Sequence, residues 1–187
     1  MKKIVLFAMS VLSVTASWSF GADRKVVAVT SIKDEACVLI NADSLQPEPE
    51  IDFFRQECAG LAGYQVIFAG GDIRSYISLK YGSAEEVTFR VSTGQFPNVS
   101  GDTIEWRATV KDNDKAVYES IVFKVEGGDP ESEGASKVIK TWVAVKLDGA
   151  DSCVVGSVLD DGSDASLEAI RKIADAAPNS KCVADNE

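Results

Sequence analysis

Runs in which apolar and polar residues alternate, with turn residues between them, dominate the chain beyond residue 24. This alternation is typical of antiparallel strands that bury one face and expose the other. No repeat of fixed period is visible, which argues against a solenoid or a propeller. We predict single strands at 25–32, 37–42 and 85–91, the last with Val87, Phe89 and Val91 pointing inward.

A hairpin is predicted around the glycine pair in YQVIFAGGDIRSYI, residues 64–77. Gly-Gly suits a two-residue hairpin turn, because both central residues of such a turn can need positive φ. A turn at Gly70-Gly71 sets Phe68 opposite Ile73. That register gathers apolar residues on one face of both strands, as a half-buried sheet requires. The core face then carries Tyr64, Val66 and Phe68, and the opposite face carries Gln65, Ile67, Arg74 and Tyr76.

A second hairpin is predicted in DTIEWRATVKDNDKAVYESIVFKV, residues 102–125. Its turn falls at Asn113-Asp114, a weaker turn pair than Asn-Gly. In that register Trp106 faces Ile121 and Ile104 faces Phe123. The other face of the hairpin receives Glu105, Arg107, Thr109, Tyr118 and Ser120.

The remaining segments complete the predicted layout. Residues 43–63 are expected as loop, because Pro47 and Pro49 interrupt regular structure, with room for a short helical turn at 51–57. Two further segments, 92–101 with the apolar Phe96 and the acidic 127–136, are also expected as loops.

The last third of the sequence combines two strands and a helix. Segments 137–147 and 153–159 are apolar on both faces, so we expect them to be covered on both sides. A helix begins at an N-cap, Ser163 or Asp164, and stops before Pro178. Its apolar face consists of Ala165, Leu167, Ile170, Ile173 and Ala174. The fold class is therefore α+β, a mostly antiparallel sheet of meander or sandwich type with one C-terminal amphipathic helix.

The N-terminal residues MKKIVLFAMSVLSVTASWSFGADRK have the three parts of an export signal. Two lysines come first, followed by an apolar run of 11 residues from Ile4 to Val14, and then by small residues. Such a run is shorter than the roughly 20 residues that span a bilayer, so cleavage is favoured over a permanent anchor. We predict a signal peptide at 1–22 and one exported domain at 23–187. The cleavage position stays open among Ser17, Ser19, Gly21 and Ala22.

Charge and cysteine content add a compartment and a partner class. Removing residues 1–22 leaves 17 Lys and Arg of the original 19, against 29 Asp and Glu, a formal charge of −12. That charge repels nucleic acid and anionic lipid and attracts basic partners, and we expect no stable insertion into a membrane. Four cysteines in an exported chain indicate two disulfides. Of the three connectivities, the favoured one joins Cys37 to Cys58 and Cys153 to Cys182 and needs no metal.

The motifs of common enzymes are missing from the sequence. GGDIRS lies between two predicted strands and lacks the spacing of a P-loop or a dinucleotide fingerprint. The chain has no histidine and no GxSxG motif, which leaves little for nucleophilic catalysis. Acidic turns at 111–115, 148–152 and 160–164 lack EF-hand spacing, and the last fits a helix cap better. We therefore expect no cofactor and no metal.

Five charged or aromatic residues remain as candidates for ligand binding: Asp72, Arg74, Tyr76, Glu105 and Arg107. Two carboxylates at a suitable separation could hydrolyse a glycoside, with Asp72 or Glu105 in the site. The competing interpretation is a set of solvated strand faces with cross-strand ion pairs. Asn98-Val99-Ser100 matches a glycosylation triplet, but an ordinary loop is favoured because the signal segment looks bacterial.

The order of Cys37, CAGLAGYQVIF with GDIRS, IEWRA, CVVGSV and a helix ending in KC resembles a group of small uncharacterised secreted proteins of Gram-negative bacteria. The resemblance covers most of the mature chain and implies a periplasmic protein with paired cysteines. It implies no activity.

Three functions are compatible with the sequence. We favour a periplasmic binding or inhibitory protein without catalysis, whose partner is a basic extracellular or periplasmic protein such as a lysozyme, with 92–101 as a contact. The alternatives are a carboxylate-dependent hydrolase of envelope glycans and a structural envelope protein that meets other proteins through its sheet edges.

Overall fold

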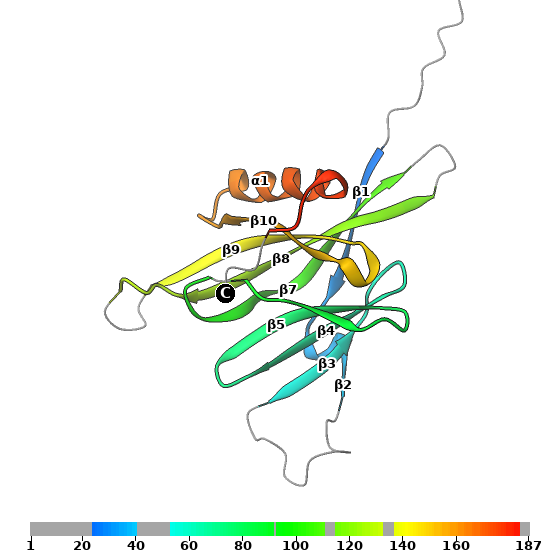
Figure 1. Cartoon of the computed structure of the whole chain (residues 1–187). Coiled ribbons are helices and arrows are strands. Elements are labelled where there is room, and N and C mark those ends of the chain that lie inside the picture. Colours follow the sequence, from blue (N-terminus) through cyan, green and yellow to red (C-terminus); the bar gives the residue numbers. More distant parts are fainter. Residues whose placement is uncertain (1–23, 41–52, 92, 111–114, 133–136, 184–187) are drawn as a thin grey trace, which may run out of the picture.

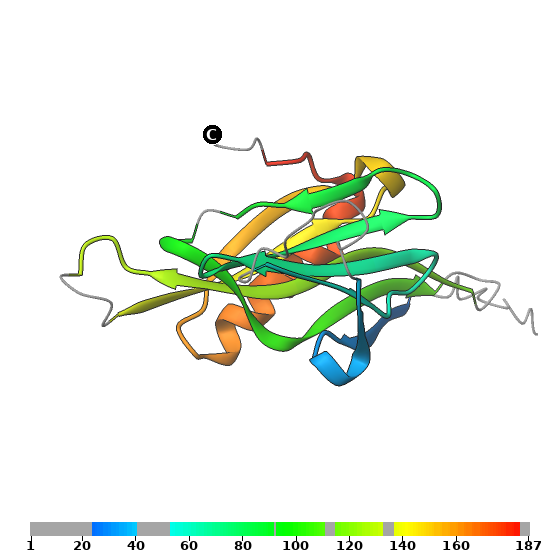
Figure 2. The ribbon, with the colours of Figure 1, turned by 90° about the horizontal axis from the view of Figure 1, so that it is seen from below.

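The computed structural model describes residues 24–40, 53–91, 93–110, 115–132 and 137–183. Within these residues, two five-stranded antiparallel sheets and one α-helix form three layers (Figure 1). Sheet A lies in the middle, with the helix on its outer face and sheet B on the other side. Figure 2 views the molecule from the side of sheet B. The predicted signal peptide lies outside the described residues.

Each sheet is built mostly from strands that follow one another in the chain. Sheet A has the order β1 (Arg24–Ser31), β7 (Gln95–Val110), β8 (Ala116–Gly128), β9 (Val138–Lys146) and β10 (Cys153–Leu159). Sheet B has the order β2 (Cys37–Leu39), β3 (Phe54–Cys58), β4 (Tyr64–Gly71), β5 (Arg74–Tyr81) and β6 (Glu86–Phe89). Short 3-10 turns are η1 (Asp34–Ala36), η2 (Gly149–Asp151) and η3 (Ala177–Asn179). The predicted α+β class is confirmed, as two stacked meanders to which β1 adds an edge.

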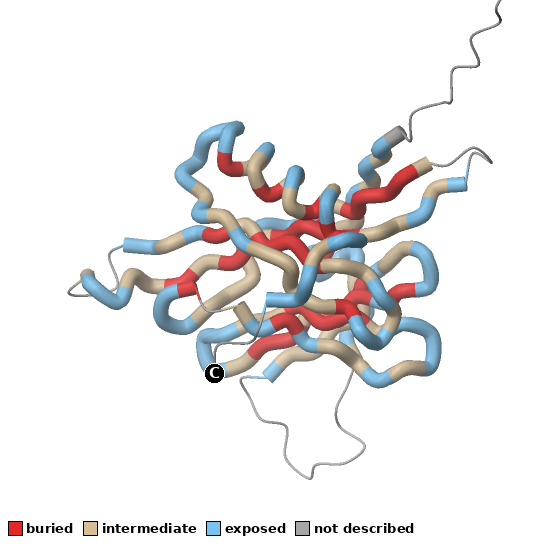
Figure 3. Tube along the Cα trace, turned by 45° about the horizontal axis from the view of Figure 1, so that its top comes forward, coloured by how far each residue is buried: buried red, intermediate tan, exposed pale blue. Residues whose placement is uncertain are grey.

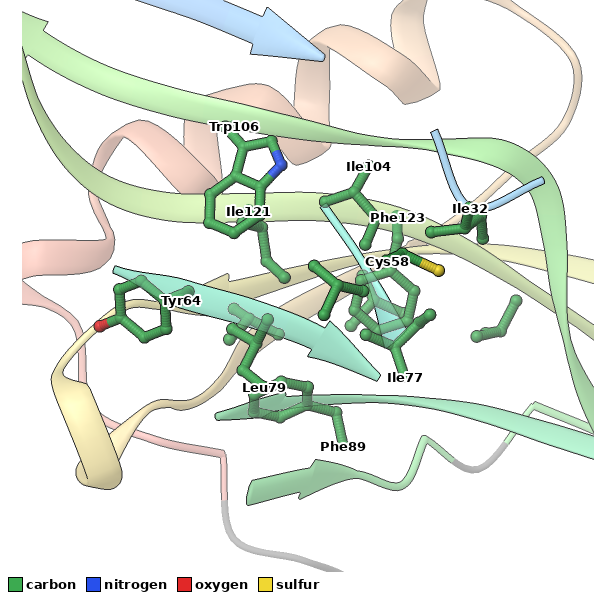
Figure 4. Close-up of a cluster of buried hydrophobic side chains, with 14 residues drawn as sticks. Ile32, Cys58, Tyr64, Ile77, Leu79, Phe89, Ile104, Trp106, Ile121 and Phe123 are labelled. Atoms are coloured by element: carbon green, nitrogen blue, oxygen red, sulfur yellow. The ribbon is translucent and has the colours of Figure 1, made fainter. Parts of the chain in front are cut away.

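The main core lies between the two sheets. Trp106, Ile121 and Phe123 of sheet A meet Ile77 and Leu79 of sheet B, and all five are almost completely buried (Figure 4). Figure 3 shows that buried residues follow the middle of the strands. Because fully burying one such side chain contributes about 1.5–3 kcal/mol, this contact is the main source of stability.

The C-terminal helix α1 (Asp164–Asp175) forms a second, smaller core on the outer face of sheet A. Ser163 is its N-cap and accepts a hydrogen bond from the Ser166 amide, as predicted. Ile170 and Ala174 pack on Val122 and Ala144 of the central strands. Strand β9 is therefore covered on both faces, as predicted for 137–147, whereas the other segment with that prediction, 153–159, is the edge strand β10, whose residues are half-buried or exposed. Among the described residues, no helix is long and apolar enough to cross a membrane.

The first predicted hairpin exists, but its turn was placed wrongly. The turn residues are Asp72 and Ile73, and β4 continues through the glycine pair. The close approach of neighbouring atoms requires glycine at position 70 of this strand. A Cβ there would lie 2.5 Å from the Arg74 carbonyl oxygen and 2.7 Å from the Phe54 ring. Because the turn lies two residues later than predicted, β4 gains two residues and β5 loses two, and side-chain parity is unchanged. Tyr64, Val66 and Phe68 therefore keep the inner face, as predicted.

The second hairpin has the predicted register at Trp106, which pairs with Ile121. Beyond Arg107 the register shifts by one residue, because a β-bulge at Glu119 inserts an extra residue in β8. The bulge turns Tyr118 toward the main core, where its ring meets Trp106 edge to face at 6.4 Å. The prediction that Tyr118 shares the face of Arg107 was wrong. The predicted turn at 113–114 lies outside the described residues.

Two segments predicted as loops are strands. Residues 54–58 form β3, so the helical turn predicted at 51–57 was wrong within the described residues. Residues 95–100 are the first part of the 16-residue strand β7, which pairs with β8 from Gln95 onward. Strand β8 likewise extends to Gly128.

Both favoured disulfides are confirmed. Cys37 and Cys58 are directly opposite each other on β2 and β3, with their Cα atoms 4.2 Å apart. Cys153 at the start of β10 bonds to Cys182 after the helix, as predicted. The second disulfide fixes the chain that follows α1 to the edge of sheet A.

Candidate functional site

The five candidate residues fall into two separate places. Asp72, Arg74 and Tyr76 belong to the β4–β5 hairpin of sheet B. Glu105 and Arg107 belong to β7 of sheet A and contact α1 on the far side of that sheet. The structure therefore does not gather them into one pocket.

Glu105 and Arg107 belong to an ion-pair network between sheet A and the helix. Arg107 forms a bidentate pair with Asp175, in which Nε and Nη2 each donate at 2.8 Å. Its Nη1 donates to Glu105. Arg171 also donates to Glu105, with Nη2 at 2.7 Å and Nε at 3.1 and 3.2 Å. Both oxygens of Glu105 are thus occupied by guanidinium groups.

The centre of the network is shielded from solvent, since Glu105 and Arg107 are nearly buried. Burial acts to lower the pKa of Arg107, but hydrogen bonds to Asp175 and Glu105 outweigh it and raise the pKa above its usual value. The hydrogen bond to Glu105 likewise raises the pKa of Arg171. Both guanidinium groups are therefore charged at neutral pH, and their ion pairs hold the helix against the sheet. We assign the network a role in positioning α1.

A lysine–glutamate pair extends this network toward β1. Lys25 donates to Thr109 at 2.7 Å and to Glu119 at 3.2 Å, and Thr109 donates to Glu119 at 2.5 Å. Glu119 is the bulged residue of β8, so the bulge supplies the carboxylate that pairs with the edge strand. The sequence alternation could not indicate this contact.

Tyr76 is half-buried on the outer face of sheet B. Across the strands it aligns with Ala69 of β4 and Arg55 of β3. Arg55 pairs with Glu86, and hydrogen bonding to Glu86 raises the pKa of Arg55. This pair reaches from β3 to β6, across the two central strands of the sheet. Tyr76 therefore belongs to a packed polar layer.

Asp72 and Arg74 lie at the tip of the β4–β5 hairpin, where the backbone is strained. Asp72 and Ile73 have φ values of 46° and 61°. Positive φ is uncommon outside glycine, and for a β-branched residue it is an outlier. Such strain costs about 1–3 kcal/mol and persists only where the surroundings enforce it.

Asn98 of β7 is the residue that holds this tip. Its Nδ2 donates to the Ile73 carbonyl at 2.7 Å and to the Phe96 carbonyl at 3.0 Å. Its Oδ1 accepts from Ser75 at 3.1 Å, and Ser75 in turn accepts from the Val99 amide. The first part of β7 thus ties the hairpin of sheet B to sheet A.

Two apolar side chains project from the tip. Ile73 is 64% exposed and Phe96 is 45% exposed. Arg74 lies over the Phe96 ring, with its guanidinium carbon 5.0 Å from the centroid, and pairs with Asp72 at 3.6 Å. A shallow open hollow lies beside these side chains. We call this region the tip surface: Phe54, Asp72, Ile73, Arg74, Phe96 and Asn98.

Part of the tip surface is predictable from the sequence. Asp72 and Arg74 were candidates and Phe96 stood out as an apolar loop residue, but Ile73 and Asn98 were not predicted to belong to a site. Ile73 was assigned to the core face of a strand because the turn was placed at the glycines. The available signal was the Asp-Ile pair after two glycines. The rules of turn composition do not favour that pair, because isoleucine resists positive φ.

The acidic turns form no metal site in the described part of the chain, where no cluster of three or more Cys, Asp or Glu side chains is arranged to hold a metal ion. Asp161 and Ser163 cap the helix instead, as predicted for 160–164. The turn at 111–115 lies almost wholly outside the described residues.

Comparison of the chain with protein-family models, with curated proteins and with solved structures finds no match.

Proposed function

We propose that this protein is a non-catalytic binding protein that contacts a basic protein partner through the tip surface. The observation that carries the proposal is the strained turn at Asp72-Ile73, which Asn98 holds so that Ile73 and Phe96 project into solvent. A two-residue hairpin turn calls for positive φ, which glycine or asparagine usually supplies, so an isoleucine there is unusual. Backbone strain of this kind is often found at binding sites.

The composition of the tip surface suits recognition of a protein. Exposed aromatic and arginine side chains carry much of the binding free energy in protein interfaces. Phe96 and Arg74 are already stacked, and the hydrogen bonds of Asn98 fix the backbone around them. Little side-chain entropy is therefore lost on binding, which favours affinity.

The net charge supports a basic partner. The chain carries 29 acidic and 19 basic residues and has no histidine. Opposite net charges speed the encounter of two proteins, and like-charge repulsion disfavours acidic competitors. A basic envelope protein such as a lysozyme fits this requirement. The two disulfides support an oxidising compartment such as the periplasm.

The glycan-hydrolase alternative has less support. Glu105 accepts hydrogen bonds from two arginines and lies against the helix, whereas Asp72 is at the hairpin tip of the other sheet. A hydrolytic pair needs two carboxylates about 5–10 Å apart around one glycosidic bond. Both oxygens of Glu105 are occupied by Arg107 and Arg171, and Asp72 pairs with Arg74 at the tip of the hairpin.

Titration calorimetry of the purified protein against a basic lysozyme, at low and high salt, tests the proposal. We expect binding that weakens with salt, and about a tenfold loss of affinity in Phe96→Ala, since truncated hot spots cost more than about 1 kcal/mol. The matched control is Leu159→Ala, which removes an exposed apolar side chain from β10, away from the tip surface. The proposal fails if neither lysozyme nor any basic protein of an envelope extract binds the protein. It also fails if Phe96→Ala and Leu159→Ala bind the basic partner with equal affinity.

A further inference from the structure

The four edge strands of the two sheets differ in how they are protected. Edge strands expose unpaired backbone groups, and proteins guard them by shortness, bulges, proline or cover. Strands β2 and β6 have only three and four residues. Strand β10 contains a bulge between Val154 and Gly156, and the Val183 amide donates to the Val154 carbonyl beside it. Three edges are therefore guarded.

Strand β1 has none of these guards. All eight residues pair with β7 in one unbroken register, from Arg24 with Val110 to Ser31 with Thr103. The segment RKVVAVTS contains no proline. Within the described part of the chain, β1 has no strand on its other side. Its long, regular edge is suited to accept a further strand.

The side chains beside this edge are apolar. Val27 and Val29 are 46% and 60% exposed. They pair with Arg107 and Glu105, which puts them on the face of sheet A that carries α1. The lysine that could guard the edge, Lys25, is engaged with Thr109 and Glu119. The valines form a small apolar strip along an open backbone edge.

We propose that β1 is a docking edge for a second copy of this chain, which pairs antiparallel with it across a two-fold axis at Ala28. Side-chain parity requires the axis to pass through a residue, since opposed residues must share a face, and Val27 and Ala28 are the two residues at the middle of β1. An axis at Ala28 sets Val27 of each copy opposite Val29 of the other. An axis at Val27 would set Lys25 opposite Val29. Only the first gathers four valines into one patch.

Charge complementarity favours the second copy as the occupant. One end of β1 carries Arg24, next to Lys25 in its pair with Glu119. The other end leads into Lys33, Asp34 and Glu35, beside Asp102, which pairs with Lys33 at 3.1 Å. Antiparallel pairing brings the basic end of each copy to the acidic end of the other. The two-fold axis generates this contact twice, once at each end of the paired strands, as in any closed dimer.

Sedimentation velocity of the purified protein over roughly a hundredfold range of concentration measures this association. We expect dimers whose fraction grows with concentration. Replacing both Val27 and Val29 by lysine should leave monomers, because four like charges would meet at the axis. The control Leu159→Lys, at a side chain that is 68% exposed on β10, should dimerise as the wild type does. Thermal melting confirms that each variant is folded.

Cysteine cross-linking tests the register, and it also decides the question if the lysine variant fails to fold. With the axis at Ala28, Val27→Cys mixed with Val29→Cys should form a disulfide-linked heterodimer, and neither variant alone should. Efficient self-linking of Val27→Cys would place the axis at Val27 and overturn the register. A wild type that stays monomeric, or that pairs β1 only with another protein's extended segment, overturns the proposal. Lysozyme binding through the tip surface is measured separately, so the two proposals can fail independently.

Discussion

Replacing Ile73 by glycine should make the protein more stable. Ile73 has a φ of 61°, a left-handed conformation that a β-branched side chain resists and glycine adopts freely. The side chain is 64% exposed and contributes little to the core. The hydrogen bond from Asn98 is accepted by the backbone carbonyl of Ile73, so a glycine at this position keeps it.

The magnitude follows from two opposed effects. Relief of the left-handed conformation contributes about 1–2 kcal/mol. Glycine also adds freedom to the unfolded chain, which costs about 0.4–1 kcal/mol. We therefore expect Ile73→Gly to stabilise the fold by about 0.5–1 kcal/mol. For a domain of this size that raises the melting temperature by roughly 1–4 °C.

A matched substitution separates the strain from the other effects. Val138 is also β-branched and 52% exposed, but it lies in β9 without positive φ. Val138→Gly should destabilise by about 1 kcal/mol, because it has the entropy cost without the relief. Urea unfolding of both variants gives the difference. Equal destabilisation by the two substitutions would show that the backbone at Ile73 is not strained. The main support for the tip surface as a binding site would then be lost. Ile73→Gly should also bind the basic partner more weakly although it is more stable.

Three further predictions concern other parts of the fold. Arg107→Leu should destabilise by about 1–2 kcal/mol in urea, since Asp175 loses its bidentate partner while Arg171 still pairs with Glu105, whereas the exposed Arg74→Leu should change stability by less than about 0.5 kcal/mol. The hydrogen bond from Lys124 holds the pKa of the Asp160 carboxyl below its usual value. The stabilisation by this pair is therefore complete above about pH 4 and is lost as the pH falls through the lowered pKa. Asp160→Asn should therefore be less stable at neutral pH and lose less stability on acidification, and equal losses would contradict the pairing. Replacing Cys153 and Cys182 by serine should cost about 3.5 kcal/mol, because their disulfide closes a loop across a separation of 29 residues; reductant should then have less effect on the variant than on the wild type.

Sequence patterns predicted the fold where a single face decides the arrangement. The alternation in 64–77 assigned Tyr64 and Val66 to the core even though the turn was misplaced, because a shift of two residues on each strand preserves parity. Helix α1 was predicted from its cap to its stop. The patterns failed at Phe54–Cys58, a short strand that follows Pro47 and Pro49, and at the bulge, where tertiary contacts decide.

The candidate site was harder to predict, because its residues are brought together by contacts between sheets. Asn98 holds the tip of a hairpin about 25 positions earlier in the chain, a relation that no local pattern carries. Glu105 and Arg107 were correctly placed on one face, but their partners on α1 decide that they position the helix. Charge alone could not separate a binding residue from a structural one.

The place of β1 in sheet A also sets an order of assembly. The strand is synthesised first, yet its only strand partner in the described chain is the second half of β7, roughly 80 positions later. The meander β7–β8–β9–β10 closes through near neighbours and can form without it. Contacts between distant segments form slowly, so β1 should be the last strand to join. Until then the outer side of β7, with Glu105 and Arg107, is the open margin of the growing sheet.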